Sequence, residues 1–303
     1  MAKNLIVILG PTASGKTRLA AQLACDFQGE VISADSRQVY RTMNIGTGKD
    51  LKEYVIDGRQ IPYHLIDIED PENEFNVFEF QKRFYAVFSA IRQRKKLPVL
   101  TGGTGLYLEA VLCAYDMPEA PINEEIRREL SEKSIEELQD LLCRLKPHLH
   151  NRTDLDDKKR LLRAVEIEKA RIRNNQDLRD RPEITAAVFG VRWERSVLRN
   201  RITKRLEERL ENGMIEEVAD LHAAGLSWLR LESFGLEYRF ISEYLQQRLT
   251  FDEMKNRLNI AIHQFAKRQE TWFRRMERKG VQINWIDNGD YLLLAEKVAK
   301  HLK

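Results

Sequence analysis

The chain opens with a short apolar run, a polar turn that contains two glycines, and a stretch of helix-forming residues. Residues 5–9 are all apolar and rich in β-branched side chains, which predicts a buried strand. Residues 18–24 read Arg-Leu-Ala-Ala-Gln-Leu-Ala and predict a helix, because most of these residue types lose little freedom in one. A strand followed by a tight turn and a helix favours an α/β fold.

The turn between these two elements carries a phosphate-binding pattern. Residues 10–17 fill every fixed position of G-x-x-x-x-G-K-[ST]. Backbone N–H groups of such a loop and of the following helix converge on an anion, while Lys16 adds a point charge and the Thr17 hydroxyl can hold Mg²⁺. The predicted phosphate-binding residues are Gly10, Pro11, Thr12, Ala13, Ser14, Gly15, Lys16 and Thr17. The pattern leaves open which phosphate compound binds.

Further apolar stretches predict more strands of the same sheet. They lie at residues 30–36, 97–101 and 188–191. Ligands of open α/β sheets bind beyond the carboxyl ends of the strands. We therefore expect Asp35 and Thr104 at the edge that carries the phosphate loop. An Asp in this place can also simply cap a turn.

The predicted strand at residues 97–101 lacks an acid at its end. P-loop enzymes that transfer phosphoryl groups use such an acid to hold Mg²⁺, but this strand runs into Thr-Gly-Gly. Asp35 and Asp67 are the acids that could serve in its place. The pattern is therefore not that of an ordinary ATPase.

Helical periodicity predicts three longer elements. Apolar residues at helical spacing indicate an amphipathic helix over residues 76–95 and another over about 251–278. A third helix repeats Leu or Ile every four residues from Leu198 and ends at Gly213. On the helix at 251–278, the residues predicted to be buried are Met254, Leu258, Ile262, Phe265, Trp272 and Met276.

The composition changes in the middle of the chain. From about residue 117 to 182 the sequence is charged and helix-forming, without a strand pattern. We therefore predict an α/β fold with a P-loop NTPase-like core, in which helices flank a parallel sheet, and an all-helical insertion domain. The core comprises residues 1–116 and 185–303, and the insertion comprises residues 117–184.

Composition narrows the class of protein. Of the 303 residues, 43% are hydrophobic and 32% are charged, which fits a globular protein with a real core. No apolar run approaches the roughly 18 residues of a membrane span, and no signal peptide is visible, so we expect no membrane partner. Cys25, Cys113 and Cys143 are widely spaced and form no C-x-x-C pair. We expect a cytoplasmic protein.

Basic residues are concentrated in a chain of net charge +3. They cluster at residues 158–173, 192–209 and 267–279. Each cluster could be a solvated helix face laced with Glu–Arg pairs. Three such clusters together favour a polyanion partner, RNA or DNA.

Several longer stretches resemble one known family. They are Gly10–Thr17, Ser-Ala-Asp-Ser-Arg-Gln-Val-Tyr at 33–40, Met-Asn-Ile-Gly-Thr-Gly-Lys at 43–49, His-Leu-Ile-Asp at 64–67, Gly-Gly-Thr-Gly-Leu-Tyr at 102–107, Lys-Arg-Leu-Leu-Arg-Ala-Val-Glu at 159–166, and Phe-Ala-Lys-Arg-Gln-Glu-Thr-Trp at 265–272. The chain resembles the tRNA dimethylallyltransferases, also called tRNA isopentenyltransferases or the IPP transferase family.

The resemblance implies a reaction. In this family the phosphate loop holds the diphosphate of dimethylallyl diphosphate rather than ATP, which accounts for the absent strand acid. The dimethylallyl group passes to the exocyclic amine of the adenosine 3′-adjacent to the tRNA anticodon, and diphosphate leaves. The implied partners are tRNA, through its anticodon stem-loop, and dimethylallyl diphosphate, with Mg²⁺ as cofactor. The helical insertion corresponds to an anticodon-stem-binding domain, and we expect a monomer.

The resemblance also implies roles for single residues. Asp35 matches the family's base, Thr104 and Arg127 match positions in the reaction channel, and Thr17 would hold the metal. The positions that match tRNA contacts are Asp35, Ser36, Arg37, Gln38, Lys159, Arg160, Leu161, Leu162 and Arg163. The chain departs from the family at two places. It has Leu-Glu-Tyr-Arg at 236–239 where the family often has Gly-Tyr-Arg or Gly-Tyr-Lys, and it has His263 where Arg is common. Glu237 would bring a negative charge to an expected RNA contact.

Three other functions would account for part of these sequence features. A P-loop kinase of a small metabolite would use the same loop and fold, but it has no use for the basic insertion. An adenylate isopentenyltransferase would act on free AMP, against which the basic helices argue. A non-catalytic RNA binder would not need Lys16 and Asp35 intact.

Overall fold

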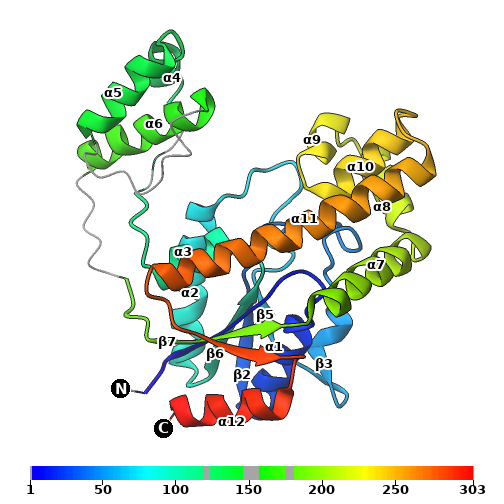
Figure 1. Ribbon diagram of the computed structural model, residues 1–303. Helices are drawn as coiled ribbons and strands as arrows, with labels where there is room; N and C mark the ends of the chain where they lie inside the picture. The colour runs from blue at the N-terminus through cyan, green and yellow to red at the C-terminus, as the bar shows by residue number, and fades with distance from the viewer. Residues whose placement is uncertain (1, 119, 121–122, 146–156, 175–180, 303) are drawn as a thin grey trace. The chain divides into compact units, whose positions relative to one another are not determined.

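The structure is a computed structural model that describes residues 2–118, 120, 123–145, 157–174 and 181–302. It divides into two compact units (Figure 1). Met1–Ala114 and Pro182–Lys303 form the core unit, and Tyr115–Arg181 form the helical unit. No helix in the described part of the chain is both long and apolar enough to cross a membrane.

The core unit is built on one parallel sheet of six strands in the order β5-β2-β6-β1-β7-β8. A separate antiparallel pair joins β3 and β4. The strands are β1 Leu5–Leu9, β2 Gly29–Ser33, β3 Val55–Ile56, β4 Arg59–Gln60, β5 Tyr63–His64, β6 Leu97–Gly102, β7 Ala186–Arg192 and β8 Ile283–Asp287. The parallel sheet confirms the predicted α/β class.

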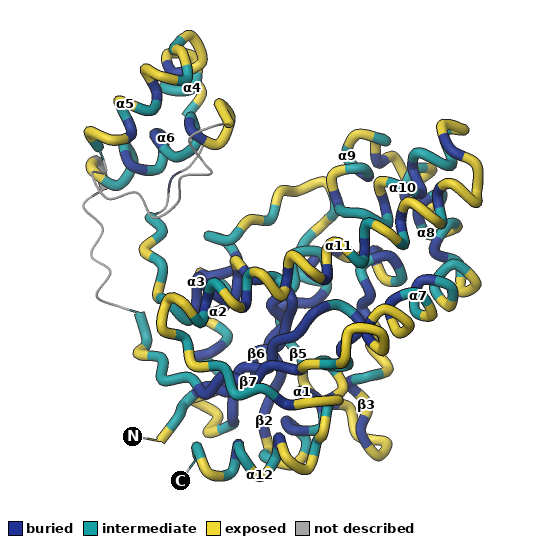
Figure 2. The backbone as a smooth tube through the Cα atoms, viewed as in Figure 1, coloured by how far each residue is buried: buried dark blue, intermediate teal, exposed yellow. Residues whose placement is uncertain are grey.

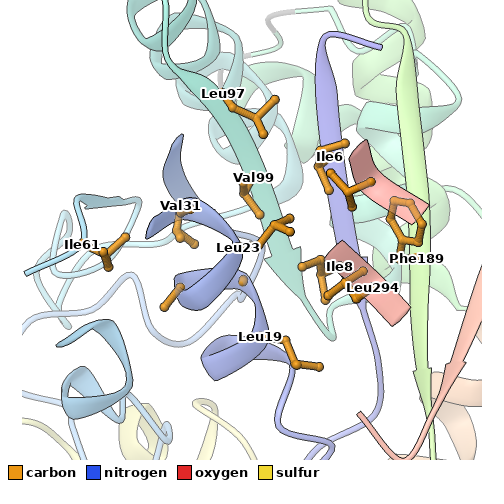
Figure 3. Close-up of a cluster of buried hydrophobic side chains, with 14 of the residues drawn as sticks. Ile6, Ile8, Leu19, Leu23, Val31, Ile61, Leu97, Val99, Phe189 and Leu294 are labelled. Carbon is orange, nitrogen blue, oxygen red and sulfur yellow. The ribbon is translucent and has the colours of Figure 1, made fainter. Parts of the chain in front are cut away.

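Side chains of the central strand β1 alternate between two hydrophobic layers, as the period of two along a strand requires. Ile6 and Ile8 face a layer that includes α1 (Lys16–Asp26) and α12 (Tyr291–Leu302) (Figure 3). Leu5, Val7 and Leu9 face α2 (Val77–Gln93), α3 (Gly105–Leu112) and the end of α11 (Phe251–Arg278). Both faces of the sheet are therefore covered, and its inner strands β1, β2 and β6 are buried along their whole length (Figure 2).

A third hydrophobic cluster lies among the helices of the second half of the chain. It joins α7 to α11 and also takes in residues from 39 to 45. These helices are α7 Arg195–Glu211, α8 Met214–Ala223, α9 Trp228–Glu232 and α10 Leu236–Leu245, with α11 running across them (Figure 1). This layer brings α7, α10 and α11 to the carboxyl ends of the strands, beside the loop at 44–50.

The long helix α11 has the predicted bounds, and the predicted burial of Met254, Leu258, Ile262 and Met276 is confirmed. Its buried side chains include Ala266, Gln269 and Phe273, at the same face as Met254 and Ile262. Phe265 is exposed and Trp272 is only half-buried, so their predicted burial was wrong. A shift of one residue along a helix turns the side chain by about 100°, which carries Phe265 off the apolar stripe.

The helical unit contains no strand among its described residues, as predicted. Its helices are α4 Glu124–Ser131, α5 Ile135–Leu145 and α6 Lys158–Asn174. They pack around a small core of leucines and one valine that is made entirely within the unit: Leu130, Leu138, Leu142, Leu161 and Val165. The side chain of Arg173, part of the first predicted basic cluster, lies outside the described residues.

Other element predictions were approximate. The second strand ends at Ser33 rather than at Ser36, so Asp35 follows the strand instead of closing it. The strand β8 and the helix α12 were not predicted at all. The sequence between Gly213 and Thr250 also forms three helices that periodicity did not separate.

Candidate active site

A cavity of about 1170 Å³ opens in the core unit at the carboxyl ends of the parallel strands. It gathers segments that are far apart in sequence. They are the phosphate loop, Asp35 to Gln38, the loop at 44–54, Thr104, and residues of α7, α10 and α11. The sequence predicted that Asp35 and Thr104 lie at the edge of the sheet that carries the phosphate loop, and the structure confirms this.

The phosphate loop has the backbone geometry that an anion site needs. Gly15 adopts a left-handed conformation with φ of 82°, and α1 begins at the next residue, Lys16. No side chain caps this helix, and its first turn contains no acid. Its first N–H groups are thus left for an external acceptor, in the positive field of the helix end.

Five of the eight predicted loop residues line the cavity, and three support the loop from behind. Thr12, Ala13, Gly15, Lys16 and Thr17 line it. Ser14 is 1% exposed, and a β-carbon on Gly10 would come within 2.6 Å of the Ser14 hydroxyl oxygen. Gly10, Pro11 and Ser14 therefore shape the loop rather than face a ligand.

Two side chains from the second half of the chain hold the loop in place. Trp193 donates from its indole nitrogen to the carbonyl of Ser14 at 2.9 Å. Gln269 accepts from the backbone N–H of Thr12 and donates to the carbonyl of Gly103, both at 2.8 Å. Gln269 is 7% exposed, so these bonds tie the phosphate loop firmly to the loop after β6.

The surroundings of Lys16 disfavour the positively charged form of its side chain. Its ammonium donates to the carbonyl of Pro11 at 3.3 Å. Burial and the positive charge of Arg205 together lower the pKa of Lys16 to about 8, although Asp35 opposes the shift. A negatively charged ligand would relieve both unfavourable effects.

Asp35 and Thr104 lie together at the wall of the cavity. One carboxylate oxygen of Asp35, Oδ1, accepts from the backbone N–H groups of Arg37 and Gln38 at 2.8 and 3.3 Å. The Thr104 hydroxyl accepts from the N–H of Ser36 at 3.2 Å. No residue that the structure describes donates to the other oxygen of Asp35, Oδ2. Asp35 therefore caps a turn with one oxygen, and its other oxygen accepts no hydrogen bond from the described residues.

Three arginines on one face of α7 line the cavity, which the sequence did not predict. Arg201, Arg205 and Arg209 are spaced four residues apart and line it together. The guanidinium of Arg201 donates to the carbonyl of Ala13 at 2.9 Å and lies 4.3 Å from the ring of Trp193. The sequence assigned these arginines to a general polyanion surface, whereas the structure turns them toward the phosphate loop.

Acidic side chains from the 3₁₀ helix η1 (Leu51–Tyr54) and the residue before it face these cations. Asp50 contacts Arg205 with an oxygen-to-nitrogen distance of 2.6 Å. The pKa of Glu53 is raised by burial and by the charge of Asp50, although a hydrogen bond with the Thr17 hydroxyl opposes the shift. Thr17 and Glu53 thus place hydroxyl and carboxyl oxygens, the ligand type of hard cations, beside the phosphate loop. No group of three or more metal-ligating side chains occurs among the described residues.

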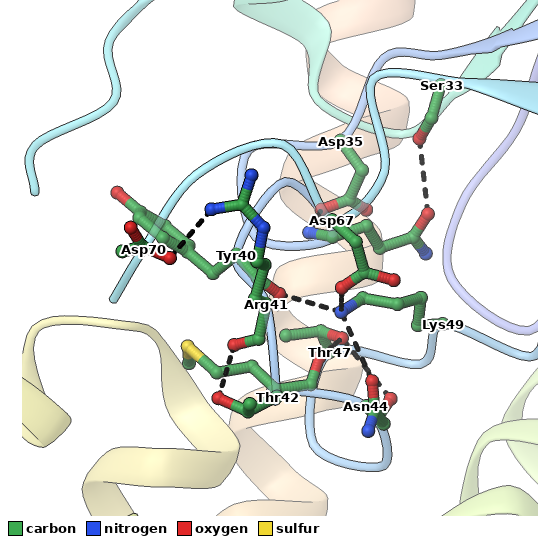
Figure 4. A network of polar contacts seen from close by, with 12 residues as sticks. Ser33, Asp35, Tyr40, Arg41, Thr42, Asn44, Thr47, Lys49, Asp67 and Asp70 are labelled. Atoms are coloured by element: carbon green, nitrogen blue, oxygen red, sulfur yellow. Dashed lines mark hydrogen bonds and ion pairs between the residues drawn. The ribbon is translucent and has the colours of Figure 1, made fainter. Parts of the chain in front are cut away.

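The loop at 44–49 is anchored at both ends. Lys49, whose side chain is fully buried, donates to the carbonyl of Tyr40 at 2.7 Å, to Asn44 Oδ1 at 3.2 Å and to Asp67 at 2.5 Å (Figure 4). At the other end, the carboxylate of Glu217 accepts three backbone N–H groups of residues 44–46. Because Asp67 pairs with Lys49 and does not line the cavity, its suggested role as a metal-holding acid was wrong.

The remaining predicted residues belong to the helical unit. Arg127 and Arg163 both bind the buried carboxylate of Glu166, at 2.7 and 3.0 Å. Lys159 is exposed, whereas Leu161 is fully buried and has no side-chain surface left for RNA. The places of Arg127, Lys159, Arg160, Leu162 and Arg163 in a functional site stay predictions.

The two departures from the family pattern both lie in the core unit. Glu237 lines the cavity and stands 3.8 Å from Arg209, and burial raises its pKa. His263 contacts the hydroxyl of Thr203 at 3.3 Å, and burial lowers its pKa. Glu237 therefore sits in the wall of the cavity as the partner of an arginine.

This cavity suits a compact polyanion on one side and a proton-donating group at Asp35 on the other. Its position beyond the carboxyl ends of the strands is the usual ligand site of open α/β sheets. The fold and the site thus define a P-loop α/β enzyme whose loop is not accompanied by the strand acid of phosphoryl transfer.

Comparison with known proteins narrows this class. A sequence model described as IPP transferase matches residues 38–276. A relative from Syntrophus aciditrophicus named tRNA dimethylallyltransferase 1 is 56% identical over 306 residues, covering 100% of both chains. Another of that name, from Geotalea uraniireducens, is 54% identical over 301 residues, covering 99% of this chain and 98% of the relative.

A solved structure supports the same assignment. The full-length tRNA isopentenylpyrophosphate transferase from Bacillus halodurans superposes with a TM-score of 0.72 at 32% identity, covering 99% of this chain and 97% of that one. The chain belongs to the IPP transferase family and is an enzyme of the transferase class. The family resemblance inferred from the motifs is thereby confirmed.

Proposed function

We propose that this enzyme transfers a dimethylallyl group from dimethylallyl diphosphate to the exocyclic amine of the adenosine 3′-adjacent to the tRNA anticodon. The observation that carries the proposal is the pairing, in one cavity, of an uncapped phosphate loop with a carboxylate oxygen that no described residue engages. Relatives of more than half identity over nearly the whole chain are named for this reaction.

At the first carbon of the dimethylallyl group one bond forms and one breaks, and a proton also leaves the attacking nitrogen. The nitrogen of the adenine amine attacks the first carbon of the dimethylallyl group, and the bond from that carbon to the diphosphate oxygen breaks. The bonding electron pair leaves with diphosphate, and the nitrogen loses a proton. Asp35 takes this proton through Oδ2, while the two N–H donors on Oδ1 hold the carboxylate in place.

Negative charge builds on the leaving diphosphate, and the cavity opposes it with fixed positive groups. The loop N–H groups, Lys16, Arg201 and Arg205 are the groups that would bind it. They are held by Trp193, Gln269 and the packing of α7, so little reorganisation accompanies the reaction. These groups would stabilise the negative charge that diphosphate gains as it leaves.

Mg²⁺ fits the residues beside the loop. This ion prefers oxygen ligands, keeps several waters and is usually held by one or two protein groups together with substrate phosphates. The hydroxyl of Thr17 and the nearby carboxyl of Glu53 match that demand. Bound there, Mg²⁺ would supply charge stabilisation for the leaving diphosphate.

The RNA side of the reaction involves both units. Arg37 and Gln38 line the cavity next to Asp35, where a base turned out of the anticodon loop would enter. Exposed basic residues of α6, Lys159 among them, suit the phosphate backbone of an anticodon stem. We also expect the enzyme to act as a monomer in the cytoplasm.

The test is transfer of label from dimethylallyl diphosphate to unmodified tRNA, with the modified nucleoside identified after digestion by mass spectrometry. We expect one labelled adenosine, 3′ of the anticodon, and no label on AMP added in excess. Transfer of the terminal phosphate of ATP to a small acceptor, without prenyl transfer, would contradict the proposal and favour a metabolite kinase. Efficient labelling of AMP would favour the free-nucleotide enzyme.

A further inference from the structure

Asp50 stands at the start of η1 but does not cap it. Asp is a favoured residue at such a position because its carboxylate accepts the first N–H groups of a helix. Here it makes no capping hydrogen bond. Its Oδ2 instead lies 2.6 Å from a guanidinium nitrogen of Arg205 and 3.9 Å from one of Arg209. The carboxylate has therefore turned from its own helix toward α7.

The two guanidiniums that Asp50 faces lie against Gly48, and both arginines line a small pocket together with Thr12 and Ala13 of the phosphate loop. A β-carbon on Gly48, which has φ of 68°, would come within 2.7 Å of Arg205 and still closer to Arg209. The positive charges of both arginines lower the pKa of Lys16. An anion bound at Lys16 would therefore lie in the field of both guanidiniums.

Arg209 is poorly satisfied in this arrangement. Its side chain is only 13% exposed, and its carboxylate neighbours Asp50 and Glu237 stand at 3.9 and 3.8 Å. Within the described residues its guanidinium donates no hydrogen bond. Burial lowers its pKa to about 10. Direct contact with Asp50 and Glu237 therefore neutralises only part of the positive charge of Arg205 and Arg209.

We propose that Asp50 is a built-in counter-ion that competes with diphosphate for Arg205. The inference rests on the proposed function, since it takes diphosphate as the anion that enters. Without substrate Asp50 neutralises Arg205, and on binding the diphosphate oxygens replace the carboxylate at that guanidinium. Asp50 is 45% exposed, so its carboxylate is readily hydrated when displaced. This competition weakens the hold on diphosphate, both as part of the donor and as the product.

A purely structural role predicts the opposite sign. If Asp50 only fastened the loop at 44–50 to α7, it would preorganise Arg205 for the ligand. Its removal would then loosen the arginine and weaken binding of diphosphate. Competition predicts that removal strengthens the binding.

The experiment titrates inorganic diphosphate into the full chain by calorimetry, in the presence of Mg²⁺. For Asp50→Asn we expect diphosphate to bind about fivefold to tenfold more tightly and to inhibit the transfer reaction correspondingly more strongly. Glu208→Gln is the matched control, because Glu208 lines the same cavity but pairs with Lys204 at 3.8 Å. We expect less than about a twofold change there.

The outcomes separate the inference from the proposed function. Unchanged or weaker binding by Asp50→Asn, or equal tightening by Glu208→Gln, would overturn the role of Asp50 while leaving prenyl transfer intact. Failure of the unaltered enzyme to bind diphosphate and to modify tRNA would overturn both. Thermal melting of the two variants near that of the parent confirms that the comparison concerns binding rather than folding.

Discussion

At the scale of single residues, Asp35 uses its two oxygens differently. Oδ1 accepts two backbone N–H groups and fixes the turn after β2, while Oδ2 has no donor among the described residues, in a side chain that lines the cavity. A carboxylate that is held at one oxygen keeps its orientation during proton transfer at the other. The turn-capping role of Asp35 and the catalytic role that we propose for it are therefore compatible.

Asp35→Asn separates these roles, because the amide oxygen of Asn can still accept from Arg37 and Gln38. We expect the rate of prenyl transfer to fall by about 10²–10⁴, since the base is lost. The affinity for tRNA should change little. Single-turnover rates and filter binding of the same tRNA measure the two quantities. A collapse of affinity with an unchanged single-turnover rate would mean that Asp35 mainly binds RNA.

The pKa of Lys16, about 8 in the structure and well below its ordinary value, predicts a pH dependence. Above pH 8 the enzyme without ligand loses this positive charge, and binding of diphosphate must restore it by taking up a proton. The affinity for diphosphate should therefore fall as pH rises above about 8, by at most about tenfold per unit.

Calorimetry at pH 9 in buffers of different ionisation enthalpy measures this proton uptake. Lys16→Arg is the control, because a guanidinium stays charged throughout. Subtraction of its titration removes the protonation of diphosphate itself. Equal proton uptake by the parent and by Lys16→Arg would show that Lys16 is already charged before the ligand binds.

At the scale of elements, the loop at 44–50 shows how a polar segment is kept rigid. Lys49 ties the loop to the Tyr40 carbonyl and to Asp67, and Glu217 of α8 accepts three backbone N–H groups of the loop. A charge that is buried without its partner costs several kcal/mol. The loop therefore has one low-energy position, and in that position it presents Gly48 and Asp50 to the arginines of α7.

Lys49→Met should destabilise the core unit by about 2–4 kcal/mol, because Asp67 and the Tyr40 carbonyl lose their donor. Urea unfolding followed by tryptophan fluorescence measures the change. The exposed Lys52 offers a matched control, and Lys52→Met should stay within about 0.5 kcal/mol. Equal stability of the two variants would show that the Lys49 bonds contribute nothing net.

The sequence predicted those elements whose signal is local. The strand–turn–helix at residues 5–26 follows from residue type and order, and α2 and α11 follow from periodicity. The inward position of Arg205 and Arg209 could not be predicted. Arginines spaced four residues apart occur both on helix faces that line a cavity and on helix faces that solvent covers, so the spacing does not distinguish the two. The contacts of Asp50 and Gln269 depend on packing across more than a hundred residues of sequence.

At the scale of the whole molecule, the basic residues divide into two kinds. Several of those on α7 line the cavity of the core unit: Arg201, Lys204, Arg205 and Arg209. Those of α6 divide again, because Arg163 binds the buried Glu166 whereas Lys159 is exposed. A net charge of +3 therefore understates the positive charge that each substrate would meet.

Lys159→Ala tests whether the helical unit contacts the RNA backbone. A lysine that neutralises one phosphate releases counterions when RNA binds, so its loss should reduce the slope of log K against log salt by about 0.7–0.9. The affinity for tRNA should fall, while the affinity for diphosphate stays unchanged. Filter binding over a range of salt concentrations gives the slope. Lys300→Ala is the control, because this exposed lysine of α12 pairs with Glu296. An unchanged slope for Lys159→Ala, equal to that of the control, would mean that the anticodon stem does not pass along this face of α6.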